Sequence, residues 1–89
     1  MEQFSRTISL VGQSAFDRVH QARVAVFGVG GVGGYVCEAL VRSGIAEIDL
    51  FDRDDVSISN LNRQIIALHS TIGQDKVDAM AARLKDINP

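Results

Sequence analysis

The sequence predicts an α/β fold of the Rossmann-like three-layer α/β/α type, with a parallel sheet of which this chain supplies the N-terminal part. Three observations predict it. A short apolar run, 24–27, leads directly into a glycine-rich stretch, 28–34. A helical pattern follows the glycines, and a second apolar run, 45–51, follows that helix. The order strand, helix, strand is typical of a parallel βαβ unit.

Bulk composition excludes several classes of protein. The 89 residues suffice for one small domain or part of one, with 46% hydrophobic and 22% charged residues, as in soluble globular proteins. The net charge of −2 and the lack of a basic stripe make these residues a poor nucleic-acid surface. A single cysteine, Cys37, excludes an internal disulfide and fits a reducing compartment. Since neither a membrane span nor a signal peptide is visible, we expect a cytoplasmic protein without membrane contact.

The first part of the chain, residues 1–22, is expected to be a helical segment before the nucleotide-binding part, residues 23–89. Residues 4–11 predict a short helix that Gly12 ends, and residues 13–21 predict a second helix. The apolar residues on one face of that second helix are Ala15, Phe16 and Val19.

The first strand is predicted over 23–27 and is apolar on both faces, as in the centre of a parallel sheet. The helix after the glycines extends to about Ser43, and Gly44 is a natural stop. The second strand covers 45–51, with Glu47 and Asp49 on its less buried side.

A polar loop, 53–59, follows the second strand. We expect a short helix from about Asn60, capped by Ser59 and interrupted by residues 69–73. The last helix is predicted over 74–87. Its apolar stripe at helical spacing consists of Val77, Met80, Ala81, Leu84 and Ile87.

The glycine-rich stretch is the most informative motif. Gly28 permits a tight turn from strand to helix, Gly30 lets the backbone approach phosphate oxygens, and Gly33 lets the helix pack close to the strand. With Gly31 they form a candidate phosphate-binding turn, because the N–H groups and dipole at a helix start attract anions. The alternative is a glycine turn that is needed only for packing.

An acid follows the second strand at the distance expected for sugar binding. Asp52 stands at the carboxyl end of that strand, beside the glycine turn, where a carboxylate can accept hydrogen bonds from ribose hydroxyls. An ordinary surface acid at a strand end is the alternative. Its pairing with the glycine turn favours ribose binding.

Two cations follow this acid and favour a triphosphate over a dinucleotide. Arg63 and Lys76 can both return to the carboxyl end of the sheet, and Asn60 and Asn62 accompany Arg63. A triphosphate needs such positive charge, whereas a pyrophosphate on a helix N-terminus often needs none. Each cation alone would be interpreted as a solvated surface residue.

These residues resemble a known group of enzymes, the ThiF/MoeB/HesA superfamily of adenylating enzymes, which includes the ubiquitin-activating enzymes. The stretch 59–64 is highly specific to it, and 62–68 is most similar to the bacterial tRNA threonylcarbamoyladenosine dehydratase branch. The other segments that carry the resemblance are 4–7, 28–34, 42–45, 52–58, 73–77 and 87–89.

The resemblance implies a role for each matching residue. The glycines would shape the ATP phosphate turn, Asp52 would hold the ribose, and Asn60 and Arg63 would contact the phosphates. Lys76 would stabilise charge at the α- and β-phosphates. Arg6 matches an arginine that reaches into the ATP site of the partner in a homodimer.

The reaction that the resemblance implies begins when a substrate carboxylate attacks the α-phosphate of Mg-ATP, which gives an acyl-adenylate and pyrophosphate. Arg63 and Lys76 are then the candidate catalytic residues. The acceptor would be modified adenosine in tRNA, which then cyclises with loss of water, or the C-terminus of a ubiquitin-like sulfur-carrier protein. The family's metal-binding aspartate would lie on a later strand, so no metal ligand is assigned here and a fragment of a longer protein is expected, inactive alone.

Two readings of other classes remain open. An NAD- or FAD-dependent oxidoreductase could use the same glycine turn, and a non-catalytic dimerisation fragment would bind no nucleotide. Cys37 lies on the packed face of the glycine helix and is expected to be a buried structural residue rather than a nucleophile.

Overall fold

The structure, a computed structural model, describes residues 2–89. Except for a helix expected from about Asn60, its helices and strands follow the order that the sequence predicts. In chain order they are the 3-10 turn η1 (Glu2–Phe4), α1 (Ser5–Val11), α2 (Gln13–Gln21), β1 (Arg23–Phe27), α3 (Gly31–Arg42), β2 (Glu47–Phe51), the 3-10 turn η2 (Ile58–Asn60) and α4 (Lys76–Ile87). The predicted α/β fold class is thereby confirmed.

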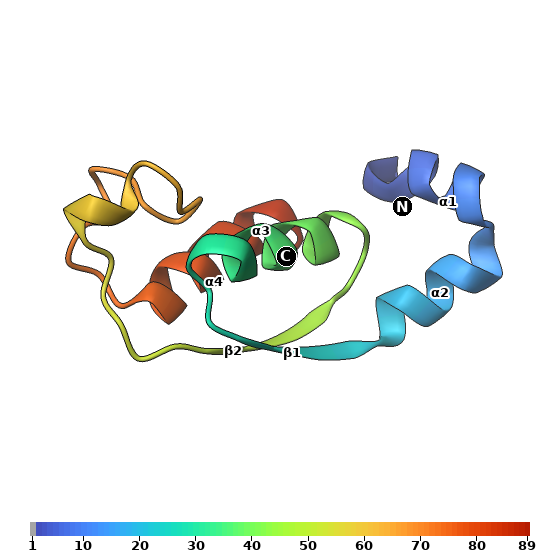
Figure 1. Cartoon of the computed structure of the whole chain (residues 1–89). Coiled ribbons are helices and arrows are strands. Elements are labelled where there is room, and N and C mark those ends of the chain that lie inside the picture. The colour runs from blue at the N-terminus through green and yellow to red at the C-terminus, as the bar shows by residue number, and fades with distance from the viewer. Residues whose placement is uncertain (1) are drawn as a thin grey trace.

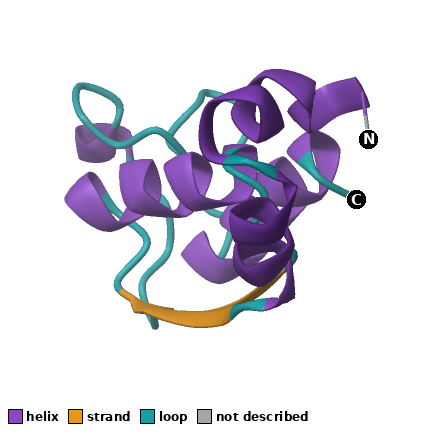
Figure 2. Ribbon diagram, turned by 90° about the vertical axis from the view of Figure 1, so that its right-hand side faces the viewer, coloured by secondary structure: helices purple, strands orange, loops and turns teal. Residues whose placement is uncertain are grey.

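The two strands pair in parallel, with Arg23 opposite Glu47 and Phe27 opposite Phe51. Helices α3 and α4 lie side by side over one face of this sheet, and the long segment between β2 and α4 closes the carboxyl end of the strands (Figure 1). The view from the other end shows the sheet at the bottom and the helices above it (Figure 2). The carboxyl ends of both strands therefore meet the start of α3 and the start of α4.

The hydrophobic core lies between the sheet and these two helices. Val26 from β1 packs there with Cys37 and Val41 from α3 and with Met80 and Leu84 from α4. Glu38 adds an ionic link between the helices, because its carboxylate contacts Arg42 within α3 at 3.0 Å and Arg83 in α4 at 2.7 Å. The remaining buried members of the core cluster are Val29, Val56, Ile66, Ala67 and Ala79.

Helices α1 and α2 extend the molecule at the amino end of the sheet, which gives it an elongated shape of 42 × 20 × 20 Å. Phe4 and Phe16 pack together with ring centroids 5.3 Å apart, and His20 stacks on Phe16. The His20 Nδ1 atom lies 2.8 Å from the carbonyl oxygen of Gly44, so α2 is tied to the turn after α3. No helix among residues 2–89 is both long and apolar enough to cross a membrane.

Several expectations about the elements were wrong. Strand β2 begins at Glu47, two residues later than predicted. Residues 61–73 form a series of turns instead of a helix from Asn60, and the preceding 3-10 turn is capped by Ser57 rather than by Ser59. The last helix begins at Lys76, because Asp75 accepts hydrogen bonds from the first free amides and so defines its start. Strand β1 is not buried on both faces in this chain, since no helix here covers the side that Arg23 and Phe27 occupy.

Candidate nucleotide site

The turn between β1 and α3 has the sharp geometry that its glycines predict. Gly28 adopts a φ of 86°, a conformation that side chains disfavour, and its amide donates to the carbonyl oxygen of Phe51 at 2.7 Å. Gly30 is the N-cap of α3, and no side chain caps the first amides of that helix. The start of α3 thus presents free N–H groups at the carboxyl end of the sheet.

Gly33 and Gly30 are required by different neighbours. A Cβ atom on Gly33 would overlap the backbone carbonyl of Gly28, so this position serves the close packing of helix and turn, as predicted. A Cβ on Gly30 would lie 2.5 Å from Oε1 of Gln64. The space beside Gly30 thus holds a side-chain amide, a neighbour that the sequence did not indicate.

Asp52 joins the glycine turn to the end of β2. Its Oδ2 atom accepts from the amide of Val29 at 3.0 Å, and its Oδ1 atom accepts from the amide of Asp54 at 2.9 Å. Burial raises the pKa of Asp52, but these backbone hydrogen bonds and the nearby positive charge of Lys76 outweigh it, so the pKa lies below its usual value. The carboxylate is ionised at neutral pH and keeps lone pairs for ribose hydroxyls.

Lys76 returns to the same end of the sheet because the segment after β2 pairs with the segment before α4. Val56 exchanges backbone hydrogen bonds of 2.8 Å with Gln74 and Gly73, and the Lys76 amide donates to Asp54 at 3.0 Å. Lys76 is only 7% exposed. A buried ammonium within electrostatic reach of Asp52 is well placed to meet a second anion.

Asn60 and Arg63 are both engaged in local contacts. The Asn60 Oδ1 atom accepts from the amide of Ser57 at 2.9 Å, in a capping box that spans η2. The Arg63 guanidinium donates to the carbonyl oxygen of Ser59 at 2.9 Å and to Asn62 Oδ1 at 2.8 Å. Asn60 is thus a buried structural residue as well as a candidate ligand, whereas Arg63 is exposed.

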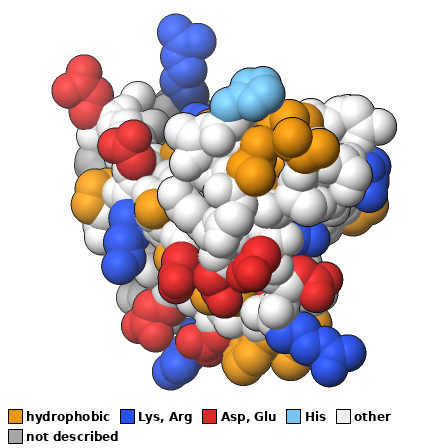
Figure 3. Space-filling view, turned by 90° about the vertical axis from the view of Figure 1, so that its left-hand side faces the viewer, with side chains coloured by type: hydrophobic (Ala, Val, Ile, Leu, Met, Phe, Trp, Pro, Cys, Tyr) orange, Lys and Arg blue, Asp and Glu red, His pale blue; other side chains and the backbone are white. Residues whose placement is uncertain are grey.

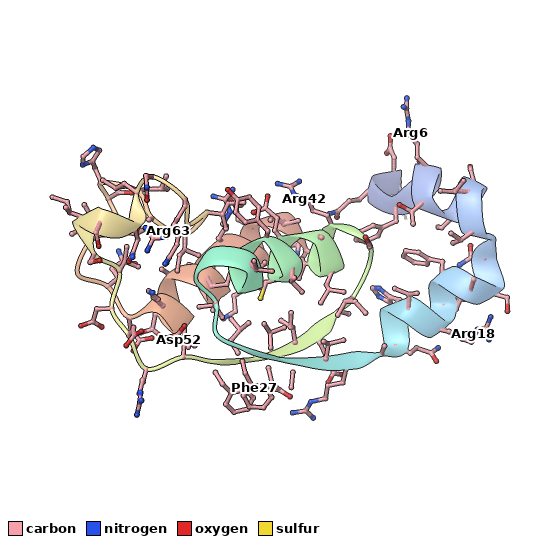
Figure 4. All side chains as sticks on the ribbon, in the orientation of Figure 1. Arg6, Arg18, Phe27, Arg42, Asp52 and Arg63 are labelled. Atoms are coloured by element: carbon pink, nitrogen blue, oxygen red, sulfur yellow. The ribbon has the colours of Figure 1, made fainter. Side chains whose placement is uncertain are left out.

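Figure 4 places the labelled Asp52 and Arg63 at one end of the molecule and Arg6 and Arg18 at the other, with Phe27 and Arg42 between them. Asp52 and Arg63 lie at the carboxyl end of the sheet, near the start of α3, whereas Arg6 projects from α1 at the opposite end. Within this chain, therefore, the structure brings together the glycines, Asp52, Lys76 and the segment of Arg63, but not Arg6.

The surface at this end carries charge of both signs. Figure 3 views this end, and acidic side chains group across its lower middle with separate basic side chains around them. Among residues 2–89, no three His, Cys, Asp or Glu side chains are grouped as a metal site. In the described part of the chain, this end therefore carries no broad basic patch, and its groups of positive character are separate cations and the free amides at the start of α3.

Three residues of this region were missed by sequence reasoning. Asp75 caps α4 and Ser57 caps η2, and both could have been found, since Asp and Ser are preferred N-caps. Gln64 gave no separate signal, because its contact with Gly30 joins distant parts of the chain.

Cys37 is fully buried, as predicted, and this burial raises the pKa of its thiol.

The ThiF family model matches residues 4–89. The chain belongs to the ThiF family. It is 53% identical over its full 89 residues to the tRNA threonylcarbamoyladenosine dehydratase of Bacillus subtilis (strain 168), of which it covers 35%. It is 46% identical over 74 residues to the ubiquitin-like modifier-activating enzyme 5 of Bombyx mori, covering 83% of this chain and 19% of that protein.

Among solved structures, the E. coli tRNA N6-threonylcarbamoyladenosine dehydratase TcdA in complex with ATP superposes with a TM-score of 0.96 at 44% identity. The match covers 99% of this chain and 36% of that one. The ThiF chain described here thus spans about a third of the length of its dehydratase relatives. Its arrangement of glycine turn, sheet and helices is that of the matching part of TcdA.

Proposed function

We propose that this ThiF chain is the ATP-binding part of an enzyme that activates a carboxylate by adenylylation, and that the enzyme is a tRNA threonylcarbamoyladenosine dehydratase. The observation that carries the proposal is the meeting of the glycine turn, Asp52 and Lys76 at one end of the sheet. The 53% identity to the B. subtilis dehydratase over the whole chain supports the tRNA branch.

Each residue has a chemical task in this proposal. The amides at the start of α3 receive phosphate oxygens, and Asp52 accepts hydrogen bonds from the ribose. Lys76 and Arg63 place positive charge where the α-phosphate gains negative charge as the substrate carboxylate attacks. Because carboxylate and triphosphate repel each other, this placement and the alignment of the two reactants lower the barrier.

ATP fits this end of the molecule, because free helix amides, an ionised acid and a buried cation are the groups that bind a nucleotide. Mg²⁺ is proposed to accompany it. Magnesium commonly takes most of its ligands from phosphates and water. No residue of this chain is assigned to the metal.

Arg6 enters the proposal through a second copy of the enzyme. It is exposed on α1, at the far end from Asp52, and therefore cannot serve the site of its own chain without rearrangement. In a homodimer, Arg6 of one copy would contact the nucleotide that is bound to the other copy. We place the enzyme in the cytoplasm, where tRNA and a reduced Cys37 occur together.

A ubiquitin-like or sulfur-carrier protein is the second candidate acceptor. The 46% identity to the B. mori modifier-activating enzyme favours this alternative, although that match covers less of the chain than the dehydratase match does. Both candidates share the adenylation step and differ in the carboxylate that attacks. The two candidate functions are distinguished by which acceptor, modified tRNA or a carrier protein, supports turnover.

The test uses the intact protein, ATP, Mg²⁺ and tRNA that carries threonylcarbamoyladenosine. We expect pyrophosphate–ATP exchange that depends on the modified tRNA, and mass spectrometry should show loss of one water from the modified nucleoside. Exchange that instead requires a sulfur-carrier protein would support the second candidate. Stabilisation of the protein by NAD but not by ATP, without exchange, would contradict adenylation altogether.

A further inference from the structure

The side-chain amide of Gln64 lies against the glycine turn. We propose that this amide contacts the phosphate chain of the nucleotide and thereby adds a recognition residue to the site. The inference rests on the proposed function, because it assumes that ATP occupies the start of α3.

The backbone of Gln64 is held firmly on both sides. Its amide donates to the carbonyl oxygen of Asn60 at 2.9 Å, and its carbonyl oxygen accepts from the amide of Ala67 at 3.0 Å. Ile66, two residues later, is 2% exposed and belongs to the core. The direction in which the Gln64 side chain leaves the backbone is therefore set by the core and not by solvent.

That direction leads to Gly30. The Oε1, Cδ and Nε2 atoms of Gln64 lie 2.5, 2.8 and 2.9 Å from the position that a Cβ on Gly30 would take. Gly30 is the N-cap of α3, and the free amides of the helix start directly after it. A phosphate that approaches these amides must therefore meet the Gln64 amide as well.

The oxygen of this amide has no hydrogen-bond donor. Gln64 Oε1 is the one buried side-chain polar atom among residues 2–89 that lacks a partner. Buried polar groups are nearly always paired, so an orphan of this kind calls for an explanation. The turn offers free N–H groups, yet none of them is aligned with this oxygen.

A bound phosphate would give the amide a partner. The last torsion of a glutamine side chain has a broad, roughly two-fold energy profile, so a half-turn exchanges the oxygen and the NH₂ group at little cost. The NH₂ group then faces the glycine turn and can donate to an anionic oxygen, in a hydrogen bond of the charge-assisted, stronger kind. Gln64 would thus act together with the α3 amides as a donor.

The test measures nucleotide binding by the intact protein with two variants of matched size. Gln64→Met keeps the length of the side chain and removes the donor, and Gln64→Glu places a negative charge at the turn. Gln21→Glu is the control, because this substitution makes the same change of charge far from the glycine turn. Gln21 is exposed at the end of α2, at the amino end of the sheet. Calorimetry gives the dissociation constants of ATP, and competition against ATP gives those of adenosine.

We expect Gln64→Met to weaken ATP binding roughly tenfold and Gln64→Glu to weaken it further, since the lost hydrogen bond involves a charged partner. Adenosine binding and the melting temperature of the nucleotide-free protein should stay at the wild-type values, as should ATP binding by Gln21→Glu. Dissociation constants for ATP within twofold of wild type in both Gln64 variants would overturn the inference. An equal loss for ATP and adenosine would also overturn it, whereas a wild-type protein that binds no ATP would refute the proposed function itself.

Discussion

The hydrogen bonds of the Arg63 side chain are all to residues close to it in the sequence. This side chain is exposed, and its guanidinium donates to Ser59 and Asn62, both within four residues of it. We therefore predict that Arg63→Ala lowers the rate of adenylation by about a hundredfold, which corresponds to about 3 kcal/mol of transition-state stabilisation. Its free energy of unfolding should change by no more than about 0.5 kcal/mol, as for other exposed side chains.

Pyrophosphate–ATP exchange and thermal unfolding of the intact protein measure these two effects. Arg18→Ala is the matched control, because Arg18 is an exposed arginine of α2 at the opposite end of the molecule (Figure 4). The control should change neither quantity. An Arg63→Ala enzyme that exchanges pyrophosphate at the wild-type rate would remove Arg63 from the proposed phosphate contacts.

Residue types at this site could be predicted from the sequence, but their hydrogen-bond partners could not. Asp52 was expected to bind sugar, and the structure places it at the predicted strand end with an added link to Val29. Asn60 was expected to contact phosphate, yet its Oδ1 atom is used by the cap of η2. Such partners depend on the path of the segment after β2, where the apolar spacing indicates a helix and the structure has turns.

The glycines at the start of α3 have different neighbours, and this predicts effects of different size for the same substitution. Gly33→Ala would press a methyl group into the backbone carbonyl of Gly28, which cannot move away without displacing the turn. Gly30→Ala would meet only the end of the Gln64 side chain, which can move. We expect Gly33→Ala to destabilise the fold by about 3 kcal/mol or more, in the range of overpacking or backbone strain.

The measurement is chemical denaturation of the two variants beside the wild type. Gly30→Ala should stay within about 1 kcal/mol of wild-type stability, since the backbone of Gly30 is extended, with a φ of −88° that alanine can adopt, and the displaced amide is flexible. The outcome that would contradict this assignment is a Gly33→Ala protein as stable as the Gly30→Ala protein.

Glu38 links α3 to α4 and gives the pair of helices a dependence on pH. Its hydrogen bond from Arg83 lowers its pKa most, with Arg42 adding to the effect against the opposing influence of burial. A carboxyl whose pKa is lower in the folded state stabilises the fold above its unfolded pKa of about 4.3, and this contribution is lost as pH falls through the folded pKa. Acid should therefore weaken the contact between the two helices.

We predict that Glu38→Gln lowers the free energy of unfolding by about 1 kcal/mol at neutral pH, and that the difference from wild type shrinks below about pH 4. Glu47→Gln is the comparison, because Glu47 forms a longer contact with Arg23, at 3.9 Å, between side chains that are 68% and 67% exposed. That variant should behave like the wild type. A Glu38→Gln deficit that is the same at all pH values would show that charge is not the cause.

Helices and strands with a regular hydrophobic period were predictable from the sequence. Residues 61–68 were not, because their apolar residues have a helical spacing although no helix forms there. The helix α2 and the strand β1 have the expected bounds, and α3 ends within a residue of the expected position but begins inside the glycine-rich stretch, at Gly31. Of the apolar residues in 61–68, Leu61, Ile65 and Ile66 reach the core from separate turns, whereas Leu68 remains 48% exposed. The hydrogen bond from Thr71 to the carbonyl of Ile66 is one of the local contacts that maintain this irregular path.

At the scale of the molecule, the sheet is covered on one face only within this chain. Phe27 and Phe51, 78% and 50% exposed, stack with ring centroids 4.7 Å apart on the uncovered face. Exposed apolar pairs on a sheet favour association between molecules. We predict that the 89-residue chain, prepared by itself, self-associates through this face.

Sedimentation velocity at increasing concentration tests this prediction. The double variant Phe27→Thr, Phe51→Thr should shift the chain toward the monomer without loss of helical circular dichroism, because threonine is tolerated in strands. Leu10→Thr is the control, since Leu10 is 85% exposed but lies on α1, away from the sheet. Equal association of the double variant and the wild type would place the contact elsewhere.

The fold class was predictable at this scale because strand, glycine turn and helix are consecutive in the sequence, and consecutive elements in such units pack together. The elongated outline was less predictable. It arises because α1 and α2 pack mainly on each other through Phe4 and Phe16 and meet the rest of the chain at few points, such as His20 and Gly44. Such contacts depend on how α1 and α2 are oriented relative to the sheet, and the hydrophobic periodicity of the sequence does not specify that orientation.

The hydrogen bond from the Val29 amide to Asp52 links the two parts of the proposed nucleotide site. It fastens the acid that we propose binds the ribose to the glycine turn that we propose receives the phosphates, so neither part can shift without the other. A substitution at Asp52 would accordingly loosen the triphosphate as well as the sugar, and would slow turnover besides weakening affinity.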